Sequence, residues 1–277
     1  MFKRYLPFFK AGAMDLVAFK FNIFSWLLVT SLQVVCIIFL WIAVYASSEF
    51  GMNSIINGFK FEEMITYLVM INIFSFVVFD GSTSWNINQE IKDGTIAMAF
   101  VKPISYRLRF VATNLGVIST MLLMFGIPGF SIAYIVFCLL EFIVIESIWM
   151  FLLHLGLFII SILIATMIND VINYIFGVLC FYTTAGFGLN TIKDVIISFL
   201  SGKLIPIAFF PAIFKDIVNF MPFASMAQNP VLIFLMKVDY IEALKMLGLS
   251  FMWLLILEFL AHILFAHASK KITVQGG

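Results

Sequence analysis

Residues 84–110 read SWNINQEIKDGTIAMAFVKPISYRLRF and lie between two long apolar runs of the chain. Six charged side chains fall within this stretch, four of them basic: Glu90, Lys92, Asp93, Lys102, Arg107 and Arg109. In membrane proteins a short basic connection between two spans marks the cytoplasmic side. The stretch therefore predicts a cytoplasmic loop, and it is much longer than a simple connection between two helices requires.

The local sequence of this loop favours a short surface helix. Gly94 permits a backbone turn, and residues 95–101 form an apolar run that can lie at the membrane interface. Pro103 ends any helix, because the residue before a proline avoids the α-helical region. Arg107 and Arg109 can then anchor the next span at the lipid headgroups. An ordinary solvated loop with anchoring arginines is the alternative interpretation of the same pattern.

The composition indicates that the whole chain is a membrane protein. It has 277 residues, of which 63% are hydrophobic and 11% are charged, whereas about 25% of the residues in a soluble domain are charged. The net charge of +1 argues against a nucleic-acid partner. The three cysteines lie in apolar runs without the spacing of a metal site: Cys36, Cys138 and Cys180. We therefore expect an all-α polytopic membrane protein, with residues 1–277 in a single transmembrane domain.

Six apolar segments approach or exceed the about 20 residues that a helix needs to cross a bilayer. They are residues 26–46, 64–83, 110–135, 147–168, 171–192 and 246–269. The polar pair Asn169-Asp170 separates the fourth segment from the fifth, which predicts a tight turn on the cytoplasmic side.

Two further segments, one at the N-terminus and one before the last span, are not expected to cross the membrane. Residues 1–22 mix four basic side chains with aromatic ones, which favours a helix lying in the cytoplasmic interface over a frayed leader. Residues 193–245 are apolar but are broken by four prolines: Pro206, Pro211, Pro222 and Pro230. The pieces between these prolines are too short to span, so they predict short re-entrant helices on the outer side before the last span.

The distribution of basic residues sets the orientation. Ten of the 16 lysines and arginines fall in segments expected inside, and six fall outside, among them Lys193 and Lys203. Because basic residues are enriched on the cytoplasmic side, both termini are predicted to be cytoplasmic.

Three stretches resemble a known family. The first is Glu90-x-x-x-Gly94-Thr95-Ile96 followed by Phe100-Val101-Lys102-Pro103-Ile104-Ser105. The second runs from Gly202-Lys203-Leu204-Ile205-Pro206 through Phe210-Pro211 and Met221-Pro222-Phe223 to Pro230, and the third is Trp253 with the ending KKITVQGG, residues 270–277. In this order the stretches resemble the ABC-2 type transporter permeases. The closing Val-Gln-Gly-Gly resembles the subfamily once grouped with antibiotic and multidrug exporters.

The resemblance implies a permease subunit of an ATP-driven exporter in the bacterial cytoplasmic membrane. Two separate ABC ATPase subunits would bind ATP and Mg, and a second permease, identical or a sister chain, would complete the path for a hydrophobic or amphipathic substrate such as a drug, a peptide or a lipid. Residues 84–109 would be the coupling loop that contacts the ATPase through Glu90, Asp93, Gly94, Thr95, Ile96, Phe100 and Pro103. The outer re-entrant motif would comprise Gly202, Pro206, Pro211, Pro222 and Phe223.

The chain itself has no motif for ATP hydrolysis. Its one Gly-Lys pair, Gly202-Lys203, has Ile197 five residues before it, where a P-loop requires glycine. No His-Glu-x-x-His sequence occurs, and the three histidines lack metal-ligand spacing with the cysteines. We therefore expect a transport subunit that is not an enzyme by itself and binds no cofactor of its own.

Glu258 and His262 form a second candidate site, near the middle of the last span. They are four residues apart, and so share one face of a helix. Since an ionisable group at that depth is costly, it predicts a substrate path or an interface with the partner permease. A structural pair that packs against a neighbouring helix is the alternative.

Two other classes of protein fit the composition. An intramembrane lipid-modifying enzyme would need several polar catalytic groups at one depth, and only Glu258 and His262 meet this condition in the sequence. An ion-coupled secondary carrier would show more intramembrane acids and repeated halves with broken helices. Co-purification with an ATPase would distinguish a permease from both.

Overall fold

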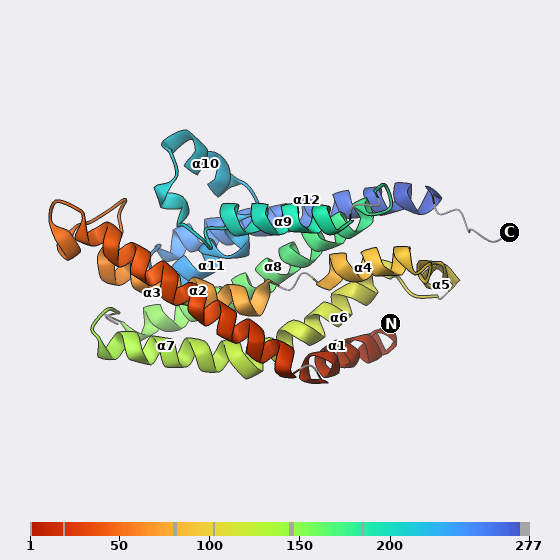
Figure 1. Ribbon diagram of the computed structural model, residues 1–277, viewed down its shortest axis with the longest axis horizontal. Coiled ribbons are helices and arrows are strands. Elements are labelled where there is room, and N and C mark those ends of the chain that lie inside the picture. Colours follow the sequence, from red (N-terminus) through yellow and green to blue (C-terminus); the bar gives the residue numbers. More distant parts are fainter. Residues whose placement is uncertain are drawn as a thin grey trace.

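The computed structural model describes residues 2–18, 20–79, 82–101, 103–143, 147–183 and 186–271. Every regular element in this described part is a helix, so the predicted all-α fold class is confirmed. The longest helices run along the long axis of the molecule (Figure 1).

Five stretches are long and apolar enough to cross a membrane, which supports a multi-pass membrane protein. They are α2 (Lys20–Ala46), α3 (Phe61–Val78) with α4 (Ser82–Lys92), α6 (Tyr106–Met121) with α7 (Ile127–Leu139), α8 (Ile148–Leu179) and α12 (Tyr240–Ala268). A π-helical turn, η3 (Leu122–Gly126), joins α6 to α7. The described residues thus contain five candidate spans where the sequence predicted six.

The missing span is explained by residues 147–192. The predicted turn at Asn169-Asp170 is wrong, because α8 continues through both residues. Their side chains bond to neighbouring elements: Asn169 Nδ2 donates to the Val78 carbonyl at 3.0 Å, and Thr83 Oγ1 donates to Asp170 Oδ1 at 2.8 Å. Asn and Asp weaken a helix when they bond to their own local backbone, and here they bond across helices instead.

The first part of the predicted fifth span belongs to α8, and its last residues, 186–192, begin α9 (Gly186–Leu200). With 15 residues, α9 is about 22 Å long, which is shorter than the ~30 Å hydrocarbon core of a bilayer.

The N-terminal helix packs directly on the beginning of the third candidate span. After η1 (Phe2–Arg4), α1 (Leu6–Ala18) crosses α6 so closely that a Cβ on Gly116 would lie 2.0 Å from the Phe9 carbonyl oxygen. The backbone amide of Ser105, just before α6, donates to the Tyr5 hydroxyl at 3.0 Å. The predicted N-terminal helix therefore exists, and its position in the membrane interface stays a prediction.

The proline-rich segment folds into short helices, as its prolines suggest. These are η4 (Ile207–Phe209), α10 (Ala212–Phe220), η5 (Ala224–Met226) and α11 (Gln228–Phe234). The Gly202 carbonyl accepts from the Tyr67 hydroxyl at 2.9 Å, and Gln228 Oε1 accepts from the Ile207 amide at 2.7 Å. These bonds tie the segment to α3 and close it on itself. Whether its helices re-enter the membrane stays a prediction.

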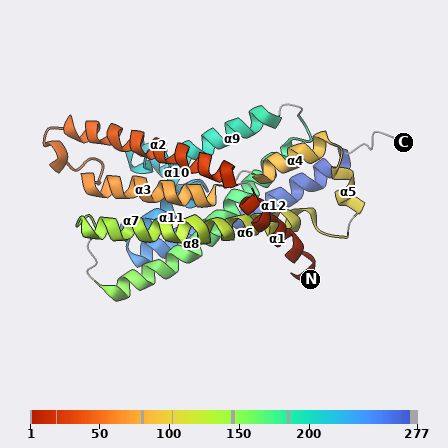
Figure 2. The same cartoon turned by 60° about the horizontal axis from the view of Figure 1, so that its bottom comes forward.

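The two ends of the molecule differ in what they contain. One end holds the α2–α3 connection, with η2 (Gly51–Asn53), and the end of α7 (Figure 1). The other end holds α1, α5 (Ile96–Val101) and the end of α12 with η6 (Ser269–Lys271), and a second view agrees (Figure 2). We call the end with α1 and α5 the α5 end, and the end with η2 the opposite end. The predicted cytoplasmic elements thus share one end of the structure.

Candidate functional site

The predicted coupling loop forms a helical hairpin at the α5 end. Gly94 has a φ of +67°, a conformation that favours glycine, and it separates α4 from the one-and-a-half turns of α5. Asp93 and Thr95 are exposed beside it. Met98 is 63% exposed and Val101 is 85% exposed, so the tip presents apolar side chains to the outside.

The expected contact residues of this loop do not all face the exterior. Ile96 is only 5% exposed and joins an apolar cluster with Tyr106 and Tyr174. Pro103 is exposed, and it lies between α5 and α6. The side chain of Phe100 lies outside the described residues.

Glu90 is also bound within the chain. Its carboxylate accepts two bonds from Arg109 Nη2, at 2.6 and 2.8 Å, and one from the Tyr106 hydroxyl at 2.9 Å. The Arg109 guanidinium in turn lies over the Phe110 ring at 4.4 Å. Glu90 therefore fixes the end of α4 to the beginning of α6.

Two residues from Arg109, a second arginine holds two carboxylates. Arg107 pairs with Asp170 of α8 through Nη1, and with Glu258 of α12 through Nη2 at 2.6 Å and Nε at 3.2 Å. We call these three residues the ion-pair cluster. Asp170 is 4% exposed and Glu258 is 37% exposed, so one carboxylate is buried and the other reaches the surface.

The buried carboxylate of the ion-pair cluster joins further helices. Asp170 Oδ1 accepts from Thr83 of α4 and from Asn114 of α6, both at 2.8 Å. The Arg107 guanidinium also lies 4.9 Å from the centre of the Tyr174 ring. Four helices, α4, α6, α8 and α12, therefore meet at one set of charges.

A buried lysine extends this polar layer to α9. Lys193 is 1% exposed, and its ammonium donates to Ser84 Oγ at 2.9 Å and to Asn173 Oδ1. It also pairs with Asp194 at 3.2 Å. We expected Lys193 in an outer segment and Ser84 at the start of the cytoplasmic loop. Because the two side chains are in contact, Lys193 and Ser84 cannot lie on opposite sides of the membrane, and the two expectations cannot both hold.

The position of Glu258 along α12 differs from the expected one. It lies 18 residues after Tyr240, or about 27 Å along the helix, close to the full ~30 Å of a bilayer core. Its partner Arg107 is the second residue of α6. If the helix starts near one membrane surface, the ion-pair cluster lies near the other surface and not at mid-membrane. His262 is exposed, and the described contacts include no bond between it and Glu258.

The expected outer motif has a structural role in the proline-rich segment. Pro206 and Pro211 immediately precede η4 and α10, where the missing amide hydrogen of proline costs nothing. Pro222 follows α10, and Phe223 precedes η5 and packs in the apolar cluster that contains Leu254. The structure brings none of these residues to the ion-pair cluster as a bonding partner among the described contacts.

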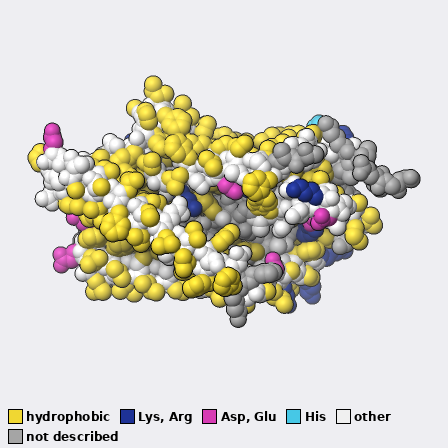
Figure 3. Space-filling model, in the orientation of Figure 1, with side chains coloured by type: hydrophobic (Ala, Val, Ile, Leu, Met, Phe, Trp, Pro, Cys, Tyr) yellow, Lys and Arg dark blue, Asp and Glu magenta, His cyan; other side chains and the backbone are white. Residues whose placement is uncertain are grey.

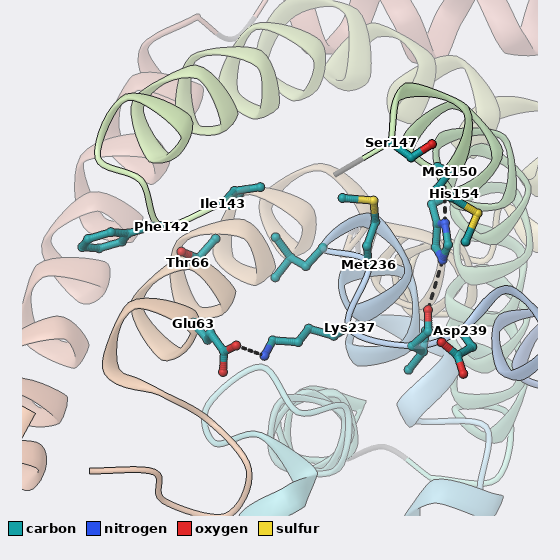
Figure 4. A pocket seen from close by; sticks show the side chains of 12 residues that line it. Glu63, Thr66, Phe142, Ile143, Ser147, Met150, His154, Met236, Lys237 and Asp239 are labelled. Carbon is teal, nitrogen blue, oxygen red and sulfur yellow. Dashed lines mark hydrogen bonds and ion pairs between the residues drawn. The ribbon is translucent and has the colours of Figure 1, made fainter. Parts of the chain in front are cut away.

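A separate cavity of about 490 Å³ opens at the opposite end (Figure 4). Glu63 of α3 and Lys237 form an ion pair on one side of it, and Asp239 lies on the other. His154 of α8 is buried, with Nδ1 2.9 Å from the Met150 carbonyl and Nε2 3.0 Å from the Val238 carbonyl. This histidine therefore joins α8 to the segment before α12.

A comparison with known families gives a match over most of the chain. A protein-family model described as "ABC-2 family transporter protein" covers residues 31–276. The chain belongs to the ABC-2 transporter family. No curated protein and no solved structure matches it. The predicted family is thereby confirmed, together with a multi-pass transport protein. Permeases of this family are membrane transport subunits that work with separate ABC ATPases and have no ATPase site of their own.

The sequence interpretation of this ABC-2 permease did not identify Arg107 and Asp170 as bonding partners. Arg107 was expected only as a headgroup anchor, and Asp170 only as part of a turn. One signal could have found them: no glycine or proline lies between Gly156 and Gly177, so Asn169-Asp170 has no support from the strongest turn residues. An uninterrupted apolar helix with an internal Asp requires a basic partner, and Arg107 is one of few available.

Proposed function

We propose that this ABC-2 permease is the transmembrane subunit of an ATP-driven exporter, in which the α4–α5 hairpin receives the movement of the ATPase. Two ABC ATPase subunits would supply ATP and Mg. The observation that carries the proposal is the chain of bonds from the hairpin into the helices. Glu90 binds Arg109, and two residues away on α6, Arg107 binds Asp170 and Glu258.

This arrangement supports a mechanical role for the beginning of α6. A displacement of α4 moves Arg109 through two charge-assisted bonds, which are stronger than neutral ones. The same helix turn carries Arg107, so α8 and α12 follow. Coupling of this kind requires two states that ATP binding favours unequally, and the ion-pair cluster would hold the helices together in both.

The contact with the ATPase is assigned to the residues that the hairpin exposes. Asp93 and Thr95 would supply polar contacts, and Met98 and Val101 the apolar ridge. Gly94 would shape the turn, and Phe100 and Pro103 stay expected members of the contact. Glu90 and Ile96 would not touch the ATPase but would hold the hairpin on α6.

A second permease, identical or a sister chain, would cover part of the apolar surface. Within the most apolar 18-residue window of α2, only 6% of the residues are buried within this chain. Phe21 is 82% exposed and Phe39 is 66% exposed on that helix. The visible face of the molecule is largely apolar between its ends, as expected of a surface that meets lipid or another permease (Figure 3).

The substrate and the orientation complete the proposal. A hydrophobic or amphipathic molecule such as a drug, a peptide or a lipid would cross between the two permeases. The α5 end would lie in the cytoplasm of a bacterium and the opposite end outside its cytoplasmic membrane. The basic residues near the α5 end support this orientation, since Arg107 and Arg109 lie there with Lys92.

The proposal is tested by retention of the ATPase on a tagged permease. Met98→Asp places a charge on the proposed apolar ridge and should weaken retention by about thirtyfold or more, since removing a central apolar contact costs about 2 kcal/mol or more. Met52→Asp is the matched control, because Met52 is also exposed but lies in η2 at the opposite end. Full retention by the Met98 variant, or equal loss in both variants, would contradict the assignment of the hairpin.

A further inference from the structure

A cavity of about 370 Å³ lies between α8 and α9, where Asn169 and Asn173 contribute to its wall. Trp26 of α2, Trp85 of α4 and Ser198 of α9 contribute to its wall, together with Asp194 and Lys203. Figure 3 shows small charged patches within the otherwise apolar and uncharged middle of the visible face. A cavity of this size fits the polar part of a small amphiphile.

Lys203 is a partly buried cation that lines this cavity. Within the described chain its ammonium makes no hydrogen bond or ion pair, and it lies 5.8 Å from the centre of the Phe79 ring. Burial lowers the pKa of the Lys203 ammonium, and the Asp194 carboxylate opposes this effect. Because desolvation disfavours the Lys203 ammonium more than the Asp194 charge favours it, an added anion would stabilise the ammonium.

The described lining of the cavity carries two opposite charges, Asp194 and Lys203. Asp194 is also paired with the buried ammonium of Lys193 at 3.2 Å, so Lys203 shares its nearest described carboxylate with a second lysine. A negative charge placed beside Lys203 would stabilise its ammonium in a partly desolvated site more than a zwitterion would.

The depth of the cavity matches the headgroup layer of a membrane. Trp26 lies 20 residues before Ala46, the last residue of α2, or about 30 Å along that helix. Phe79 lies 18 residues after Phe61, or about 27 Å along α3. These lengths equal the hydrocarbon thickness, so the cavity lies at the membrane boundary nearer the α5 end, where tryptophans are favoured.

A second cavity, of about 230 Å³, shares Trp26, Phe79 and Ser82 with the first. One side of its wall is apolar, with Ile23, Phe76 and Met121, and the other is polar, with Asp15, Asn22 and Asn86. An acyl chain fits the apolar side, and a free inorganic anion gains nothing from it.

We infer that Lys203 and its cavity bind the phosphate of an anionic phospholipid from the membrane leaflet at the α5 end. The tryptophans lie at the glycerol level, and the apolar side of the adjoining cavity accepts part of an acyl chain. The site is independent of the ATPase contact, so it does not require the proposed coupling loop to be correct.

Tryptophan quenching by lipids with brominated chains tests this inference on the purified full-length permease in neutral detergent. Brominated phosphatidylglycerol should quench at about fivefold lower concentration than brominated phosphatidylcholine, the effect expected of one basic residue. The preference should disappear in Lys203→Gln and persist in Lys245→Gln, whose lysine is exposed on α12. A variant in which Trp26 and Trp85 are both phenylalanine should lose the preferential quenching, which would assign that quenching to the two tryptophans of the cavity.

Two further conditions separate the possible ligands and guard against misfolding. Lys203→Arg keeps the charge, so it should retain the preference if the loss in Lys203→Gln is electrostatic. Sodium phosphate should fail to displace phosphatidylglycerol, and displacement would show a site for a free anion and overturn the lipid assignment. Equal quenching by the two lipids in the unaltered protein, or an unchanged preference in Lys203→Gln, would also overturn it.

Discussion

Replacing Arg107 with alanine is expected to destabilise the purified permease by about 3–5 kcal/mol, the cost of removing one partner from a buried ion pair. The buried Asp170 would lose its only guanidinium among the described contacts, while Thr83 and Asn114 would continue to donate to it. Glu258 would lose its partner as well, but it is partly exposed and water can solvate it. The measurement is the thermal unfolding temperature in one fixed detergent.

Three variants make this first prediction specific. Arg4→Ala removes an exposed arginine of η1 and should leave the unfolding temperature unchanged. Asp170→Asn added to Arg107→Ala removes the unpaired charge and should recover most of the lost stability, since a neutral amide is far cheaper to bury than a carboxylate. An unaltered unfolding temperature in Arg107→Ala would show that the ion-pair cluster does not hold the four helices together.

The second prediction concerns how Glu90 acts. Glu90→Ala should weaken retention of the ATPase by about tenfold, because a bidentate bond between charged groups contributes about 1.5–3 kcal/mol and here positions the hairpin. Arg109→Ala should have the same effect, although Arg109 lies on α6 and not on the hairpin. The double variant should be no worse than either single one, because both remove the same pair.

This double-mutant cycle distinguishes positioning from direct contact. If Glu90 touched the ATPase itself, Glu90→Ala would weaken retention and Arg109→Ala would not. Additive losses would show two independent contacts and would contradict the positioning role. Lys92→Ala is a useful control for charge on α4, because Lys92 is exposed near the end of the same helix.

The sequence was sufficient for the features that depend on local chemistry. Gly94 predicted the turn because its conformation requires a glycine-like residue, and the structure has a positive φ there. Pro206 and Pro211 predicted breaks in the apolar segment, and both lie immediately before short helices. The all-helical fold follows from long uncharged segments, which leave the backbone no other way to satisfy its hydrogen bonds in lipid.

Features that depend on tertiary partners could not be derived in this way. Asn169 and Asp170 predict a turn when their side chains are assigned to local backbone, but in the structure they bond to Val78, Thr83 and other helices. Lys193 was assigned to an outer segment because it follows the predicted fifth span, whereas its ammonium is buried against Ser84. A polar residue in an apolar chain thus says that a partner exists without saying which helix supplies it.

The role of Glu258 illustrates the same limit. Spacing along the sequence paired it with His262, since residues four apart share a helix face. The structure pairs it with Arg107, which is 151 residues away in the chain. In the structure Glu258 links α6 to α12, and its place on a substrate path stays a prediction. Whether it also meets the partner permease stays a prediction.

The central claim is that the ion-pair cluster carries movement of the hairpin to α12, and alkylation of a cysteine on α12 tests it most directly. Leu255 is 56% exposed, and Leu255→Cys in a variant without Cys36, Cys138 and Cys180 provides a single reporter. In the complex with the ATPase, adding a non-hydrolysable ATP analogue should change the alkylation rate at position 255. Adding Glu258→Ala should abolish that change while the ATPase stays bound. The same nucleotide-dependent change with and without Glu258 would contradict the claim.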